Sequence, residues 1–167
     1  DVIGELTAMT PGPYLHIGGD EALGTAPEDF ALFVERATEM VADRLLAAYG
    51  TDARVTALLD RASIDVIPVC NPDGYIHTWT TNRLWRKNRR INGDGTFGVD
   101  LNRNWAFQWG GGGASTVPND DTYRGPSPFS EPESAALRDY FIANTALAGH
   151  IDFHSYSQLV LSPWGYT

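Results

Sequence analysis

Helix signals alternate with β-branched apolar runs along this chain, and this alternation restricts the possible folds more than any other feature of the sequence. Residues 30–49 repeat apolar side chains at helical spacing and are followed by Gly50, a residue type that commonly ends helices. The run IDVIPV at 64–69 is rich in β-branched residues and is typical of a central strand. A second helix signal, SEPE, stands at 130–133. Helices that alternate with strands favour an α/β fold, in which a mixed β-sheet is flanked by layers of helices.

Two predicted capping boxes mark the starts of helices. In each box a hydroxyl group and a carboxylate three residues later satisfy the first backbone N–H groups of a helix. Thr25 forms one box with Glu28, and Ser130 forms the other with Glu133, whose helix is expected to end near Asn144. The other expected elements are a short helix at 55–60, mostly irregular chain at 70–98, and strands at 14–18, 149–155 and 158–165.

Length and charge exclude some classes of function. A chain of 167 residues has the size of one ordinary domain, and residues 1–167 are expected to form a single compact unit. The net charge of −9 argues against a general nucleic-acid binder, and no apolar run approaches the roughly 18 residues of a membrane span. The segment NRLWRKNRR at 82–90 reverses the charge locally. Four of its cations are expected to be surface charges: Arg83, Lys87, Arg89 and Arg90.

Five motifs follow one another between residues 42 and 167: VIPVCNPDGY, NRLWRKNRR, GVDLNRNW, YRGPSPFSEPES and IDFHSYSQLVLSPWGYT. In order and spacing they resemble the zinc metallocarboxypeptidases of the carboxypeptidase A type, peptidase family M14. The resemblance implies a carboxypeptidase-like α/β fold and hydrolysis of C-terminal peptide bonds. It also implies zinc as the cofactor, peptide or protein C-termini as partners, and a secreted protein, although no signal peptide is recognisable in the chain.

This resemblance assigns roles to individual residues. An arginine fork binds a carboxylate through two parallel hydrogen bonds, and Arg103, with Asn102, matches the positions that hold the terminal carboxylate. Arg86 matches the guanidinium that stabilises the oxyanion formed when water attacks the carbonyl group. His154 matches a zinc ligand, and Tyr156 matches an aromatic residue that contacts the substrate. Without the resemblance, the two arginines would be solvated surface cations and His154 a structural histidine, and these alternatives stay open here.

The zinc site implied by the resemblance is incomplete in this sequence. In the family two further ligands come from a His-x-x-Glu sequence, and counting back from Ala42 places it at 28–31, where the chain reads EDFA. The general-base Glu and the residues that set side-chain specificity would follow Thr167. Because a zinc hydrolase needs its ligands and its base, weak or no peptidase activity is expected of the chain alone. A non-catalytic module that binds C-terminal carboxylates is an alternative.

Residues 1–41 have a second resemblance. The sequence TPGPYLHIGGDEA contains the His-x-Gly-Gly-Asp-Glu signature of the β-N-acetylhexosaminidases of glycoside hydrolase family 20. In this alternative Glu21 is the general acid, and Asp20 steadies the acetamido group of a sugar that attacks its own anomeric centre. The chain would then be a chimera, with a hexosaminidase-like segment at 1–41 and a truncated carboxypeptidase-like segment at 42–167. The competing interpretation is that Asp20 and Glu21 are exposed turn carboxylates before a helix.

Overall fold

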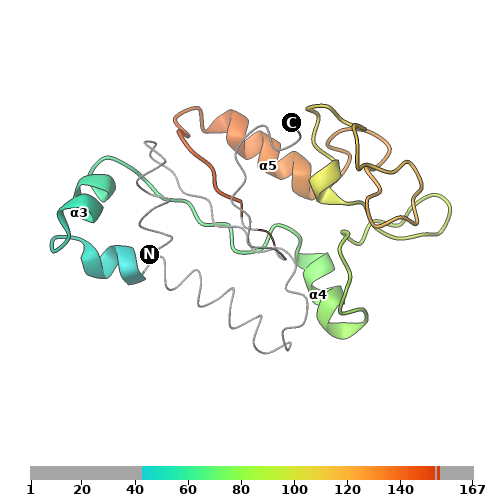
Figure 1. Ribbon diagram of the computed structural model, residues 1–167, viewed down its shortest axis with the longest axis horizontal. Helices are drawn as coiled ribbons and strands as arrows, with labels where there is room; N and C mark the ends of the chain where they lie inside the picture. Colours follow the sequence, from blue (N-terminus) through green and yellow to red (C-terminus); the bar gives the residue numbers. More distant parts are fainter. Residues whose placement is uncertain (1–42, 153, 155–167) are drawn as a thin grey trace.

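The computed structural model of the protein describes residues 43–152 and residue 154. Residues 43–48 are helical, and the labelled elements that follow are α3 (Ala53–Leu59), α4 (Pro72–Thr80), the short 3-10 helix η1 (Leu101–Arg103) and α5 (Pro132–Ala143) (Figure 1). In this part of the molecule no helix is both long enough and apolar enough to cross a membrane.

The first two helices confirm the predicted stop and the predicted short helix. Gly50 has a φ of 79°, which glycine adopts without the steric cost that other residues pay, and it directly follows the turn that ends residues 43–48. Asp52 then caps α3, because its carboxylate accepts hydrogen bonds from the backbone N–H groups of Arg54 and Val55. These two bonds lower the pKa of Asp52 below its ordinary value.

Helix α4 is an unpredicted element within residues 70–98, which are otherwise irregular as predicted. The sequence NPDG begins the helix, with Pro72 in its first turn. Asn71 is the N-cap, and its side-chain Oδ1 accepts a hydrogen bond from the backbone N–H of Gly74 at 2.9 Å. The helix was not predicted because Asn followed by Pro serves a helix start as well as a turn. Gly74 packs against the neighbouring chain, where a Cβ would come within 2.6 Å of the carbonyl oxygen of Lys87. This contact sets α4 against the segment that carries the cations.

Helix α5 begins later than the capping box predicted. Its N-cap is Glu131, with Pro132 in the first turn, and no side chain caps the helix by a hydrogen bond. The hydroxyl of Ser130 instead donates to the Glu131 carboxylate at 2.7 Å, while the Glu133 carboxylate accepts from Asn88. The predicted Ser130–Glu133 box was therefore wrong, because both side chains have partners outside the helix. The predicted end near Asn144 is confirmed, since Asn144 is the C-cap.

The expected mixed sheet is not visible in the described residues. Two isolated bridges join described residues, Ile91 with Phe97 and Ser115 with Tyr123, and His154 is a bridge residue as well. The described residues contain no extended strand, and none is assigned at 64–69 or 149–152. The strands expected at 14–18 and 158–165 and the capping box of Thr25 and Glu28 lie outside the described residues.

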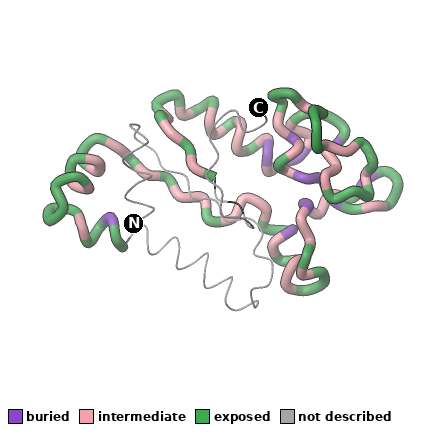
Figure 2. Tube along the Cα trace, in the orientation of Figure 1, coloured by how far each residue is buried: buried purple, intermediate pink, exposed green. Residues whose placement is uncertain are grey.

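Most of the buried residues lie where the chain before η1 meets the start of α5 (Figure 2). Unusually, most of them are polar, and among the described residues the buried apolar side chains are those of Leu45 and Val99. Aromatic contacts lie beside this junction, with Trp105 packing edge-on to Phe129 and stacking on Phe141 of α5. The buried polar residues are Lys87, Asn88, Asn92, Asp100, Asn104, Glu131 and Ser134.

Candidate functional site

Arg86 is held by a buried carboxylate. Its Nε lies 3.0 Å from Oδ2 of Asp100, and its Nη2 lies 3.4 Å from Oδ1, so the two groups meet fork to fork. The Asp100 side chain is 3% exposed, whereas that of Arg86 is 27% exposed. The guanidinium is therefore fixed from its buried side and still reaches solvent.

The same carboxylate also organises the next segment. Oδ1 of Asp100 accepts a hydrogen bond from the backbone N–H of Asn102 at 3.0 Å, and Asp100 is the N-cap of η1. Arg103 is the last residue of that 3-10 turn. Asp100 therefore joins Arg86 to the Asn102–Arg103 pair, which sequence reasoning had assigned to one site without a residue that connects them.

Arg103 is oriented by two carbonyl oxygens. Its Nε donates to the carbonyl oxygen of Gly113 at 2.9 Å, and its Nη1 donates to that of Asn102 at 3.0 Å. Gly113 has a φ of 81°, a conformation in which a side chain would be strained, so this position requires glycine. Within the described chain these bonds use two of the five N–H donors of the guanidinium.

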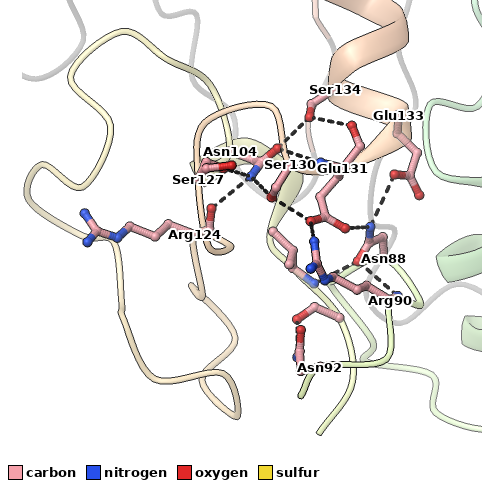
Figure 3. A network of polar contacts seen from close by, with 12 residues as sticks. Asn88, Arg90, Asn92, Asn104, Arg124, Ser127, Ser130, Glu131, Glu133 and Ser134 are labelled. Carbon is pink, nitrogen blue, oxygen red and sulfur yellow. Dashed lines mark hydrogen bonds and ion pairs between the residues drawn. The ribbon is translucent and has the colours of Figure 1, made fainter. Parts of the chain in front are cut away.

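A network of polar contacts begins at Asn104, the residue after Arg103 (Figure 3). Asn104 is fully buried, and its Nδ2 donates to the carbonyl oxygens of Arg124 and Ser127 at 2.9 and 3.0 Å. The same Nδ2 lies 2.9 Å from Oγ of Ser130, while its Oδ1 accepts from Oγ of Ser134 at 2.6 Å. Because Asn104 follows Arg103 immediately, the network fixes the end of η1.

The cations of NRLWRKNRR are not simple surface charges. Lys87 is 3% exposed and donates from Nζ to the carbonyl oxygen of Pro118 at 2.8 Å. Burial lowers the pKa of Lys87, and the carboxylates of Asp121 and Asp120 oppose that shift. Arg90 forms an ion pair with the buried Glu131, its Nη1 lying 2.7 Å from Oε1. The prediction of surface charge was wrong for Lys87, which is buried. The side chain of Arg90 is 36% exposed, but it pairs with a buried carboxylate and is not a simple solvated cation.

Arg89 and Arg83 pack on aromatic rings instead. The guanidinium of Arg89 lies 4.6 Å from the ring centre of Trp85 and 4.7 Å from that of Phe97, and Arg83 lies 4.0 Å above Trp79. His77 of α4 meets Trp85 edge-on, with 4.8 Å between ring centres. Burial and then the charge of Arg89 lower the pKa of His77 below its ordinary value.

The described residues do not form a zinc site. His154 is 43% exposed, and its Nε2 lies 2.9 Å from Oδ2 of Asp152, which is equally exposed. Across residues 43–152 and 154, no three histidine, cysteine or acidic side chains are placed to hold a metal ion together. One imidazole and one carboxylate are fewer ligands than a catalytic zinc requires. Tyr156, Asp20 and Glu21 lie outside the described residues.

Comparison with known proteins gives this geometry a family. The family model described as zinc carboxypeptidase, Peptidase M14, matches residues 35–167, which is most of the chain. The chain belongs to the zinc carboxypeptidase family. The match begins within the segment 1–41, and the comparisons give no support to a hexosaminidase-like segment or to a chimera.

Several curated zinc carboxypeptidases are similar in sequence. Rat carboxypeptidase A2 is 45% identical over 136 residues, which are 80% of this chain and 33% of that protein. Metallocarboxypeptidase A of Trichophyton rubrum is 43% identical over 134 residues, covering 78% of this chain and 32% of that protein. The chain thus spans about a third of the length of the curated relatives it matches.

Solved structures support the α/β carboxypeptidase fold. Bovine thrombin-activatable fibrinolysis inhibitor, in complex with tick carboxypeptidase inhibitor, matches with a TM-score of 0.74 and 32% identity over 95% of this chain and 51% of that chain. Carboxypeptidase A from Helicoverpa armigera matches with a TM-score of 0.62 and 34% identity over 87% of this chain and 34% of that one. The predicted carboxypeptidase-like α/β fold class is thereby supported, although the described residues contain no strand.

Sequence reasoning missed the residues that hold the arginines in place. Asp100 and Asn104 stand inside the motif GVDLNRNW, and Asn88 and Glu131 stand in the two neighbouring motifs. A carboxylate immediately before a short turn is a signal for an N-cap, and this signal was available at Asp100. No local pattern indicated that Asn88, Asn104 and Glu131 would be buried together.

Proposed function

We propose that the chain recognises the C-terminal carboxylate of peptides, as part of a zinc carboxypeptidase that hydrolyses C-terminal peptide bonds. The observation that carries the proposal is the double role of Asp100, which holds the guanidinium of Arg86 and caps the turn that contains Asn102 and Arg103. One buried carboxylate thus holds Arg86 directly and Arg103 through its turn, which supports a defined anion-binding arrangement, whereas solvated surface cations have no such common anchor.

The roles follow from the chemistry of each group. In this proposal Arg103 and Asn102 hold the terminal carboxylate, and Arg86 stabilises the negative charge that develops on the carbonyl oxygen. Tyr156 contacts the substrate. The carbonyl oxygens of Gly113 and Asn102 use two of the N–H donors of Arg103. The remaining donors support its proposed role, because two-point binding of a carboxylate needs two N–H groups side by side.

Hydrolysis by this chain alone is proposed to be weak or absent. The described donors do not make a zinc site, and the sequence has EDFA where the family has His-x-x-Glu. We keep His154 as a zinc ligand of the complete protein, where zinc would polarise the carbonyl group and activate water. The non-catalytic alternative, a module that binds C-terminal carboxylates, rests on the same arginines and differs only in this step.

Calorimetry with a matched pair of ligands tests the proposal. The first ligand is benzoylglycyl-phenylalanine and the second is its C-terminal amide, which lacks the negative charge. The acid is expected to bind the full chain at least about tenfold more tightly than the amide, as one charge-assisted contact provides. Arg103→Gln should abolish that preference, and Arg103→Lys should restore only part of it.

Arg61→Gln is the matched control, because Arg61 is exposed and, among the described residues, its Nε donates to the carbonyl oxygen of Ala57 beside the end of α3. It should leave the preference unchanged. Equal binding of acid and amide by the parent chain would refute carboxylate recognition. Release of phenylalanine from the acid, measured with and without added zinc, separates the peptidase from the binding module.

A further inference from the structure

We propose that Glu131 is a positioning residue that holds Arg86 and Arg103 in register, and this inference rests on the carboxylate-binding function proposed above. Glu131 is 1% exposed and stands at the N-cap of α5. It contacts neither arginine. It acts through two branches of hydrogen bonds, which diverge from the two oxygens of its carboxylate (Figure 3).

The carboxylate has three donors at short distances. Nδ2 of Asn88 lies 2.7 Å from Oε2, while Nη1 of Arg90 and Oγ of Ser130 each lie 2.7 Å from Oε1. A buried carboxylate needs such partners, because its desolvation otherwise costs several kcal/mol. Each of the three contacts therefore constrains the position of the segment that supplies it.

The first branch leads to Arg86. Asn88, two residues after Arg86, accepts at Oδ1 from the backbone N–H of Val99 at 2.8 Å, and its own N–H donates to the Val99 carbonyl oxygen at 3.0 Å. Asp100 follows Val99 directly and holds the guanidinium of Arg86. The position of Asn88 against Glu131 thus sets where Asp100 meets Arg86.

The second branch leads to Arg103. The Ser130 hydroxyl donates to Glu131 and accepts from Nδ2 of Asn104 at 2.9 Å. The backbone N–H of Glu131 also points to Oδ1 of Asn104 at 3.3 Å. Because Asn104 is the C-cap of η1, this branch fixes the turn whose last residue is Arg103.

An amide cannot replace this carboxylate. Both oxygens of Glu131 accept, whereas glutamine presents one oxygen and one NH₂ group. In Glu131→Gln the NH₂ group of the glutamine would point either at the NH₂ of Asn88 or at the donors of Arg90 and Ser130. Two donors cannot bond to each other, so one of the two branches loses its contact, although the side chain keeps its shape. The variant therefore tests the hydrogen bonds separately from packing.

The experiment compares the full chain with Glu131→Gln, Ser130→Ala and the control Glu133→Gln. Glu133 also reaches Nδ2 of Asn88, at 3.2 Å, but it lies at a half-buried position. Two quantities are measured at a temperature where every variant is folded. They are the affinity for benzoylglycyl-phenylalanine and the Nε–Hε signals of Arg86 and Arg103 in ¹⁵N–¹H NMR spectra, assigned with Arg→Lys variants.

Glu131→Gln is expected to shift at least one arginine signal and to weaken binding of the acid about tenfold. Ser130→Ala should shift the Arg103 signal alone, because it cuts only the second branch. Glu133→Gln should leave both signals in place. A general destabilisation of the fold would change both arginine signals, so a shift of the Arg103 signal alone in Ser130→Ala indicates an effect specific to the second branch.

The proposal would be overturned if the Nε–Hε signals of Arg86 and Arg103 kept their wild-type positions in Glu131→Gln. It would also be overturned if all three variants shifted these signals identically. If Glu131→Gln does not fold, Ser130→Ala decides: a shift of Arg103 alone supports the proposal and no shift overturns it. If the parent chain does not prefer acid over amide, the proposed function fails, while the NMR signals still report whether Glu131 positions the arginines.

Discussion

The guanidinium of Arg86 and the carboxylate of Asp100 form an ion pair in which only the arginine reaches solvent, with 3.0 Å between Nε and Oδ2. The pair stands between two loops, because Asp100 also accepts from the backbone of Asn102. An anion that approaches Arg86 from solvent therefore meets a group whose direction is already set. This pre-orientation lowers the entropy lost on binding.

Asp100→Asn tests that arrangement. Asparagine keeps the shape and can still accept from Asn102, but it removes the charge opposite Arg86. We expect the free energy of unfolding to fall by about 1–3 kcal/mol in urea titrations, since a buried charged hydrogen bond is lost. Affinity for benzoylglycyl-phenylalanine should also fall. The control is Asp94→Asn, which should bind the ligand normally, because the exposed Asp94 carboxylate accepts from the backbone N–H and the hydroxyl of Thr96.

Asn104→Ala should be among the most destabilising single changes in this part of the protein. It leaves the carbonyl oxygens of Arg124 and Ser127 and the hydroxyl of Ser134 without their amide partner in a buried setting. We expect a loss of about 2–4 kcal/mol in the free energy of unfolding, measured by urea titration. Asn102→Ala, two residues earlier and exposed, should cost far less. Similar losses for both would contradict the account of the network.

Two glycines separate backbone strain from steric overlap. Gly98 and Gly95 have φ values of 86° and 84°, yet a Cβ at Gly98 would lie 2.5 Å from the carbonyl oxygen of Asn88, and one at Gly95 would meet nothing within 4 Å. Gly95→Ala should cost about 1–2 kcal/mol, the strain of a left-handed conformation. Gly98→Ala should cost clearly more in the same thermal unfolding assay. Equal costs would mean that the chain relaxes around Gly98.

His77 predicts a pH dependence of stability. Its folded-state pKa is lowered by burial and by Arg89, so below its ordinary pKa the unfolded chain binds a proton that the folded chain does not. The contribution of His77 is therefore fully present above that pKa and is lost as the pH falls through the window beneath it. His77→Phe keeps a ring edge against Trp85 and removes the titration. Between about pH 5 and pH 7, the stability of the parent chain should rise more steeply than that of the variant.

A good part of the fold could be predicted from local signals. The stop at Gly50, the short helix after it and the end near Asn144 depend on residues within one helical turn, so adjacent letters contain the information. The start of α4 was misjudged because Asn71 and Pro72 suit a turn and a helix equally well. The family was recognised because its motifs keep their order and spacing.

The candidate site could be predicted only in its outer residues. Arg86 and Arg103 were singled out, whereas Glu131, which we propose to position them, was not. The bond from Asn88 to Glu131 joins residues 43 positions apart, and no periodic pattern announces a contact of that span. Lys87 was misjudged for the same reason, since its partner, the Pro118 carbonyl oxygen, is 31 residues away.

The polar junction behind η1 limits how this region can vary among related proteins. In an apolar core one aliphatic side chain replaces another of similar volume at small cost. Asn104 has no such substitute, because no other side chain offers an amide donor and acceptor on so short a stem. Exchanges here are therefore expected to occur as compensated pairs, such as a change at Asn88 together with one at Glu131. The contacts among Trp105, Phe129 and Phe141 require no matched hydrogen-bond donors and acceptors, so these residues can be substituted one at a time.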